Sequence, residues 1–302
     1  MQPHNRAWNS PDIQEDSHIA VLGKYLAQLE DNNAESIRRL NDKQEFWIIS
    51  DYSGDHSDSK AWSISLLLAA TDDIYKWKAQ IISLREAHNF TREMSYKKLG
   101  DRRRAQFLND FLNCADQLTG NLITVCMPRK IELLFPASEQ YNEIKLKWQE
   151  NLGMTFIWKK GILYKAVAVA SYLVYLIAGF SKAGQSAVWV TDNDSIVPNE
   201  QALDSIKILI DEVSRQILPH EMDVFRLGRD SDTESWVKNL TAIPDLASGV
   251  FTDFSLASPQ IDPTNIVIEL GDNLPEKART VLRWLSSTEG ANLKKVNVYL
   301  DD

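Results

Sequence analysis

The chain has 302 residues, of which 44% are hydrophobic and 25% charged, and its formal net charge is −9. This composition is typical of a globular protein with a substantial buried core. The negative charge argues against a protein whose whole surface binds nucleic acid, although it leaves room for a local basic patch. The two cysteines and five histidines form no cluster with zinc-ligand spacing, so neither a zinc site nor a disulfide framework is expected.

Two stretches bear on where the protein resides. The opening residues, MQPHNRAWNSPDIQEDSH, lack the basic and then apolar pattern of a signal peptide, so we expect a cytoplasmic protein. Residues 161–180 are long and apolar enough to span a bilayer. They include Lys165, Ser171 and many small residues, which suit a helix packed closely on a sheet. We therefore predict a buried helix there and no membrane partner.

Hydrophobic periodicity predicts strands and helices in alternation. Segment 11–40 is expected to be mostly helical, and strands over 44–50 and 61–70 are expected to pair antiparallel across a polar turn. The next predicted elements are a helix over 72–89 with Thr71 as N-cap, an extended segment or short strand over 92–99, a helix over 101–118 capped by Asp101, and a strand over 121–128.

The second half of the chain continues this alternation. Its predicted elements are a helix around 138–150, the long apolar helix over about 160–181, a strand over 186–194, a helix over 199–218, a strand over 222–228, a helical stretch interrupted by Pro244, a strand over 264–270, a helix around 275–287 and a strand over 294–300. An initial hairpin followed by such alternation predicts an α/β fold with a mixed sheet covered by helices.

Three aspartates fall where an α/β protein forms a site. Asp51 ends the first predicted strand, Asp192 ends a later one, and Asp245 follows a proline near the start of a predicted helix. Carboxylates from separate elements can converge beyond strand ends, where they repel one another unless a cation lies between them. Oxygen ligands suit Mg²⁺ or Mn²⁺, which support phosphodiester hydrolysis. Each aspartate has an equally good interpretation as a turn or cap residue.

The order of elements and the placement of these acids resemble the ribonuclease-H-like superfamily. More narrowly, the chain resembles the family called domain of unknown function 3800, whose members open with a strand ending in Asp-Glu-Ser-Gly. The stretch ISDYSGDHSD keeps Asp51, Ser53 and Gly54, and it has Tyr52 where the family has Glu.

Four later matches extend this resemblance to roughly residues 44–256. The family's Glu-x-Lys element is matched loosely by REMSYKKL, and its closing Leu-Gln-Leu-Ala-Asp-Leu-x-Ala-Gly motif by LTAIPDLASGVF. The positions that match the family are Glu93 and Lys97 in the first motif, Asp192 and the pair Asp230 and Ser231 between the two, and Asp245, Leu246 and Gly249 in the last.

The resemblance implies a fold and an activity. The fold is a ribonuclease-H-like mixed sheet with helices on both faces over 44–256, an N-terminal helical extension over 1–43 and a C-terminal α/β extension over 257–302. The activity is a metal-dependent, nuclease-like hydrolysis of RNA or DNA with Mg²⁺ or Mn²⁺. The implied metal ligands are Asp51, Asp192 and Asp245, with Glu93 as a weaker fourth, and the implied substrate contacts are Lys97, Ser53 and Arg102.

Two other functions stay open. A ribonuclease-H-like scaffold without catalysis would bind a protein or a nucleic acid, and Tyr52 in place of Glu favours it. The strand end with Asp192 and Asp194 also matches, superficially, the Asp-x-Asp motif of haloacid-dehalogenase-like phosphotransferases. That motif normally opens its domain, and the required downstream lysine is not evident here. A protein partner is expected at the N-terminal helices or the C-terminal tail, which lie outside the ribonuclease-H-like resemblance.

Overall fold

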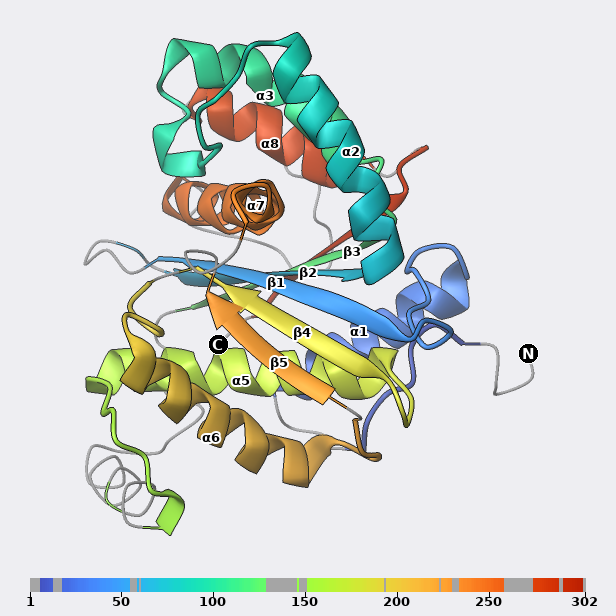
Figure 1. Ribbon diagram of the computed structural model, residues 1–302, viewed down its shortest axis with the longest axis vertical. Coiled ribbons are helices and arrows are strands. Elements are labelled where there is room, and N and C mark those ends of the chain that lie inside the picture. The colour runs from blue at the N-terminus through green and yellow to red at the C-terminus, as the bar shows by residue number, and fades with distance from the viewer. Residues whose placement is uncertain are drawn as a thin grey trace.

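The structure is a computed structural model of the chain. It describes residues 6–12, 18–54, 59, 61–128, 146, 151–192, 194–222, 224–229, 234–257, 274–287 and 290–300. A six-stranded sheet forms the middle of the protein, and helices cover both of its faces (Figure 1). This arrangement confirms the predicted α/β class and its mixed sheet.

The sheet combines antiparallel and parallel pairs. Its strands are β1 (Glu45–Ser53), β2 (Ala61–Ala70), β3 (Gly120–Pro128), β4 (Ser186–Thr191), β5 (Val224–Arg229) and β6 (Leu293–Tyr299). They lie in the order β5-β4-β1-β2-β3-β6. β2 is antiparallel to β1, as the hairpin prediction required, and also to β3, whereas β4 is parallel to both β1 and β5. β6 runs parallel to β3, so the C-terminal segment completes the same sheet.

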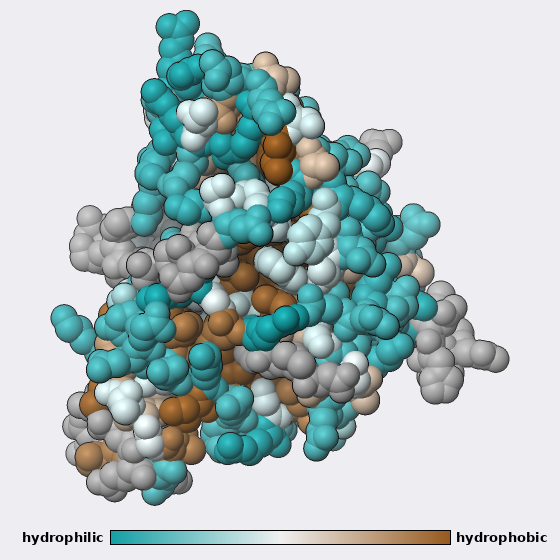
Figure 2. Space-filling model, in the orientation of Figure 1, coloured by the Kyte–Doolittle hydropathy of each residue, from teal (hydrophilic) through white to brown (hydrophobic). Residues whose placement is uncertain are grey.

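Two groups of helices cover the sheet. They are α1 (His18–Asn32), α2 (Thr71–Ala87), the short 3₁₀ helix η2 (Tyr96–Lys98), α3 (Arg102–Ala115), α5 (Lys160–Phe180), α6 (Glu200–Ile217), α7 (Val237–Ala257) and α8 (Glu276–Ser286). α7 lies directly on β1 and β2, with α2, α3 and α8 on the same side, and α1, α5 and α6 cover the opposite face (Figure 1). Hydrophilic residues dominate the surface over α2 and α3 (Figure 2).

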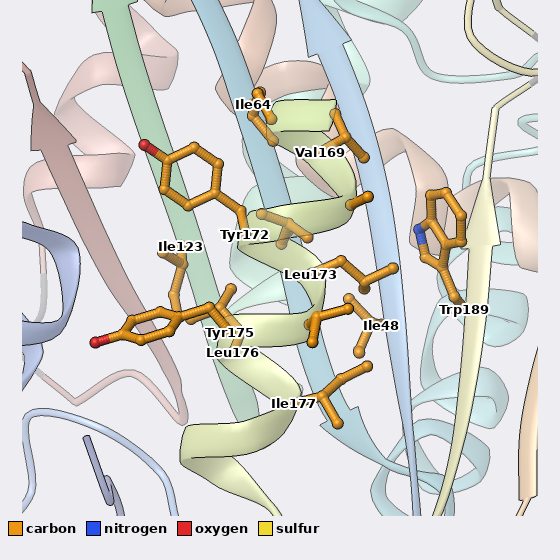
Figure 3. Close-up of a cluster of buried hydrophobic side chains, with 14 of the residues drawn as sticks. Ile48, Ile64, Ile123, Val169, Tyr172, Leu173, Tyr175, Leu176, Ile177 and Trp189 are labelled. Carbon is orange, nitrogen blue, oxygen red and sulfur yellow. The ribbon is translucent and has the colours of Figure 1, made fainter. Parts of the chain in front are cut away.

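Helix α5 forms the core of one face. Its residues Tyr172 and Leu173 are fully buried, and they lie toward Ile48 and Ile64 of the hairpin strands (Figure 3). By length and composition, Gly161–Phe180 is the single helix among the described residues that could cross a membrane, yet 83% of its most apolar window is buried inside the protein. The predicted buried helix is therefore confirmed, since the sheet and neighbouring helices cover its apolar surface.

The second strand of the hairpin has the predicted bounds, whereas the first strand and the start of α2 differ from the prediction. β1 continues through Asp51 to Ser53, because the antiparallel pairing with β2 continues past Asp51, which lies opposite Ser65. Asp51 is thus inside the strand and not at its end. The predicted N-cap of α2 is wrong as well: Thr71 is the first helical residue, and its hydroxyl donates to Glu45 at 3.0 Å.

The predicted interruption at Pro244 is also wrong. α7 runs without a break from Val237 to Ala257, with Pro244 inside it. A proline within a helix removes one backbone hydrogen bond and costs about 3 kcal/mol. Burial of the apolar side chains Ile243 and Leu246 between the sheet and the outer helices offsets that cost. As a result, Asp245 lies in the middle of a long helix and not near its start.

The remaining predicted elements differ little from the structure. Asp101 does cap α3, accepting a hydrogen bond from the backbone of Arg104 at 3.1 Å. The segment predicted as extended over 92–99 contains the short helix η2, and β4 ends at Thr191. The strand predicted over 264–270 and the helix predicted around 138–150, except for its residue 146, lie outside the described residues.

We expect truncation of Leu173 to weaken the fold strongly, because this fully buried side chain fills the space between α5 and the sheet. Leu173→Ala should lower the free energy of unfolding by about 2–5 kcal/mol, measured by urea denaturation. Val21→Ala is the matched control, since Val21 on α1 is 47% exposed, and it should change stability by less than about 0.5 kcal/mol. Equal losses in the two variants would show that α5 is not a core helix.

Candidate functional site

A pocket of about 350 Å³ opens on the α7 side of the sheet. Asp51, Asp192 and Asp245 all line it, although they come from three segments far apart in the sequence. The parallel register pairs Ser50 of β1 with Thr191 of β4, and the residue that follows each of them is an aspartate. α7 packs across β1 and brings Asp245 to the same place from above. The three predicted acids therefore share one pocket.

Asp51 points from β1 toward α7. The residue is 8% exposed, and its carboxylate accepts a hydrogen bond from the hydroxyl of Ser248, one turn after Asp245 on the helix. Ile49, two residues earlier on β1, belongs to the same core as α7, as strand alternation requires. The hydrogen bond from Ser248 holds a buried carboxylate in place at the floor of the pocket.

Tyr52 points to the opposite face of the sheet. Its hydroxyl lies 2.6 Å from that of Ser50 and 3.0 Å from that of Thr191, and Trp189 donates its indole N–H to Ser50 at 2.8 Å. The ammonium of Lys165 on α5 lies 5.2 Å from the centre of the tyrosine ring. A glutamate at this position would have pointed to the same side, so Tyr52 removes no carboxylate from the pocket. It instead ties β1 to β4 directly behind the pocket.

Burial and mutual repulsion disfavour the charged forms of the carboxylates. Burial raises the pKa of Asp51 well above its usual value, and the charges of Asp245 and Asp192 raise it further, whereas the bond from Ser248 lowers it. Burial also raises the pKa of Asp245 to about 6, although the backbone N–H of Tyr96 donates to it at 2.6 Å. Without a bound cation, the pocket therefore destabilises the ionised forms of Asp51 and Asp245.

The rim of the pocket carries one acidic and two basic side chains. Glu93 forms an ion pair with Lys238 of α7 at 2.6 Å, and Lys98 of η2 lies 3.6 Å from the other carboxylate oxygen. All three residues line the pocket. These contacts lower the pKa of Glu93, with the hydrogen bond from Lys238 as the main cause. Glu93, predicted as a fourth metal ligand, thus pairs with two lysines at the rim.

One stripe of α7 supplies much of the site. Lys238, Thr241, Ala242 and Asp245 line the pocket at helical spacing, and Ser248 continues the stripe to Asp51. The sequence prediction interrupted this helix at Pro244, and it therefore did not include Lys238 and Ser248 among the site residues. Lys238 lies seven residues before Asp245, and Ser248 lies three residues after it. In a continuous helix this spacing places all three side chains on one face, which is the sequence signal for them.

The predicted substrate contacts lie away from the pocket lining. Lys97 on η2 is exposed, and its charge lowers the pKa of Asp245, but the pocket is lined by Lys98 instead. Ser53 pairs with Ser63 at the end of β1, and Arg102 is the exposed first residue of α3. The predicted pair at positions 230 and 231 lies outside the described residues.

Asp194 plays a local role in its loop. Its carboxylate accepts backbone hydrogen bonds from Ile196 at 2.8 Å and from Val197 at 3.2 Å, in the manner of an aspartate that stabilises a turn. Asp192 lines the pocket and Asp194 does not. An arrangement in which these two aspartates act together on one phosphoryl group therefore has no support from the pocket.

Gly249 allows a close contact beside the site. A Cβ atom at this position would lie 2.5 Å from the ring of Tyr96, which packs on α7. The same tyrosine donates its backbone N–H to Asp245 and its hydroxyl to Asp253, both at 2.6 Å. The glycine therefore lets the segment before α3 approach the helix closely enough to orient the Asp245 carboxylate.

The carboxylates do not form a preassembled metal centre. In the part of the chain that the structure describes, no group of three or more histidine, cysteine, aspartate or glutamate side chains is arranged to hold a metal ion. Asp51 bonds to Ser248 and Asp245 to the backbone of Tyr96. The donors are nevertheless all oxygens in a partly buried pocket, which is the ligand type that hard divalent cations take.

Comparison with known proteins adds no relative. The chain matches no protein-family model, and a search of curated proteins finds no match. The geometry and charge of the pocket therefore carry the functional argument.

We expect Asp245→Asn to stabilise the protein in a pH-dependent way when divalent metal is absent. Folding raises the pKa of Asp245 from 3.8 to about 6, so the folded protein favours the protonated carboxyl. The stability that this preference contributes is full below about pH 4 and is lost as the pH rises through 6. The gain of the variant over wild type should be larger at pH 7.5 than at pH 4.5 by about 1–2 kcal/mol. Urea denaturation in a chelating buffer measures it.

Asp204→Asn provides the control for this experiment, since Asp204 on α6 is 67% exposed and lies on the other side of the sheet. It should show no such dependence on pH. A gain from Asp245→Asn that is the same at both pH values would contradict the raised pKa.

Proposed function

We propose that this pocket is the active site of a divalent-metal-dependent phosphodiester hydrolase that acts on RNA or DNA. The observation that carries the proposal is the convergence of Asp51, Asp192 and Asp245 in one pocket whose rim also holds Lys98 and Lys238. Acids that attract a divalent cation, beside lysines that attract a phosphate, are the combination that phosphodiester hydrolysis requires.

The topology supports the same proposal. Three antiparallel strands, β1 to β3, are followed by β4 and β5 parallel to β1, and the acids lie on β1, directly after β4 and on the later helix α7. This is the order of elements and acids on which the sequence resemblance to the ribonuclease-H-like superfamily rests. We therefore propose a ribonuclease-H-like domain.

The donor set fits Mg²⁺ or Mn²⁺. Asp51, Asp192 and Asp245 are the residues that would hold the ion, and the raised pKa values of Asp51 and Asp245 support a compensating positive charge there. When bound, such an ion supplies an activated water and neutralises charge on the phosphate. Ser248 and the backbone of Tyr96 would orient two of the three carboxylates toward it.

The rest of the pocket would position the substrate. Lys98 and Lys238 lie at the rim, and the uncharged residues Met94 and Ala242 form part of the wall. A volume of about 350 Å³ is at the low end for ligand sites, which suits one phosphodiester with its neighbouring sugars better than an intact duplex. We therefore propose a single-stranded or locally opened nucleic acid as substrate.

Cations gather beside the pocket in spite of the overall negative charge. Residues 92–104, REMSYKKLGDRRR, contain six lysines and arginines and only two acids, in a chain with a net charge of −9. A local basic segment next to an acidic site directs a nucleic acid to that site while most of the surface repels it. A reducing, cytoplasmic setting is part of this proposal, because Cys114 and Cys126 are both buried and free.

We expect Mn²⁺ to raise the melting temperature of the wild-type protein. A ligand at a hundredfold excess over its Kd stabilises the folded state by about 2.7 kcal/mol. Asp51→Asn combined with Asp192→Asn should abolish this rise and the cleavage of a fluorescent single-stranded oligonucleotide. Asp204→Asn, which removes an exposed acid on α6, should leave both unchanged. Thermal denaturation with and without Mn²⁺ and a gel-based cleavage assay provide the two measurements.

The same experiment addresses the alternative of a scaffold without catalysis. A wild-type protein whose melting temperature does not respond to Mn²⁺ or Mg²⁺ would contradict the metal site and would leave the scaffold as the better account. A metal response without cleavage of either RNA or DNA would retain the site and contradict the nuclease activity.

A further inference from the structure

The rim of the pocket holds two lysines together through one glutamate. Glu93 is 2.6 Å from Lys238 and 3.6 Å from Lys98, so its carboxylate lies between two ammonium groups that come from different elements. The glutamate is 145 positions from Lys238 in the sequence, and the contact exists only because the segment before η2 packs beside α7. The carboxylate of Glu93 therefore lies at the pocket rim, between the ammonium groups of Lys98 and Lys238.

We propose that Lys98 and Lys238 form a phosphodiester-binding subsite and that Glu93 is an exchangeable counter-ion, which the substrate phosphate displaces. The inference rests on the proposed function and specifies how that site takes its substrate. It assigns Glu93 to a gate over the subsite and not to the metal-ligand role that the sequence resemblance implied. A phosphate oxygen pair replaces the two carboxylate oxygens between the same ammonium groups.

The charges of the pocket fit a singly charged diester. Three ionised aspartates and one divalent cation leave one negative charge, and the two rim lysines turn this into one positive charge. Glu93 neutralises that charge in the absence of substrate, and a phosphodiester, which carries one negative charge, neutralises it equally well. Addition of the diester without departure of the glutamate would leave an excess negative charge in a partly buried site, which is unfavourable.

The exchange is energetically easy. The side chains of Glu93, Lys98 and Lys238 are 49%, 54% and 39% exposed, so water screens the ion pairs that hold the glutamate. Such pairs contribute about 0–1 kcal/mol each. The floor of the pocket differs, since Asp51 is 8% exposed and hydrogen-bonded to the neighbouring helix. The rim can therefore rearrange while the floor stays in place.

A nearby ion pair offers a matched control. Glu234, just before α7, pairs with Lys78 of α2 at 3.1 Å, and it is 75% exposed. This pair joins a lysine and a glutamate from distant segments, as the rim does, but neither residue lines the pocket. Glu234→Gln and Glu93→Gln change the net charge equally, so any difference between them reports on the pocket itself.

The test measures binding of a fluorescein-labelled eight-nucleotide oligothymidylate by fluorescence anisotropy, with Ca²⁺ as the divalent ion. Glu93→Gln should lower the Kd about two- to fivefold, since the competing anion is removed, whereas Glu234→Gln should change it by less than that. Lys238→Gln should raise the Kd, and it should reduce the slope of log Kd against log salt concentration by about 0.7. Lys78→Gln is its control and should leave the slope unchanged.

The outcomes separate the subsite from the proposed function. Equal effects of Glu93→Gln and Glu234→Gln, or weaker binding by Glu93→Gln, would overturn the gate. The rise in melting temperature with Mn²⁺, measured on the same variants, should be unchanged in Glu93→Gln, and its loss there would make Glu93 a metal ligand and overturn the gate as well. Failure of the wild-type protein to respond to Mn²⁺ would instead contradict the proposed function.

Discussion

The parallel pairing of β1 with β4 is the constraint on which the site depends. It places Asp51 beside Asp192, and α7 then closes over the pair with Asp245. The arrangement gathers like charges in a pocket with limited access to water, which raises the pKa of two of the three carboxylates. A structure that needed only stability would not gather acids in this way, and our proposal of a bound cation rests on this observation.

The surroundings of the acids are of two kinds. Behind and above the floor, contacts are buried and directional: Ser248 bonds to Asp51, Tyr52 joins β1 to β4, and Gly249 admits the tyrosine whose backbone bonds to Asp245. At the rim, the ion pairs of Glu93 are exposed and screened. In the function that we propose, the buried floor would fix the metal ligands and the exposed rim would exchange one anion for another as a charged polymer enters and leaves.

Local patterns in the sequence were sufficient for some of the site and not for the rest. The runs of apolar residues before Asp51 and Asp192 predicted two strands that lead to these acids, although Asp51 lies inside its strand and Asp192 directly after its own. Lys238 and Ser248 were not, because Pro244 suggested a broken helix, whereas burial against the sheet keeps α7 continuous and aligns the stripe. The choice of Lys98 over Lys97 depends on the orientation of η2, which no periodicity encodes.

The sequence by itself determined the α/β class, the positions of most helices and strands, the hairpin of β1 and β2, and the burial of α5, because each follows from the spacing of apolar residues along a short stretch. Only the tertiary structure decided that β6 joins the sheet beside β3, that the hydroxyl of Tyr52 lies beside that of Thr191, and that Glu93 pairs with lysines. Those outcomes depend on contacts between residues far apart in the chain, and such contacts are set by how whole elements pack together and not by any local pattern.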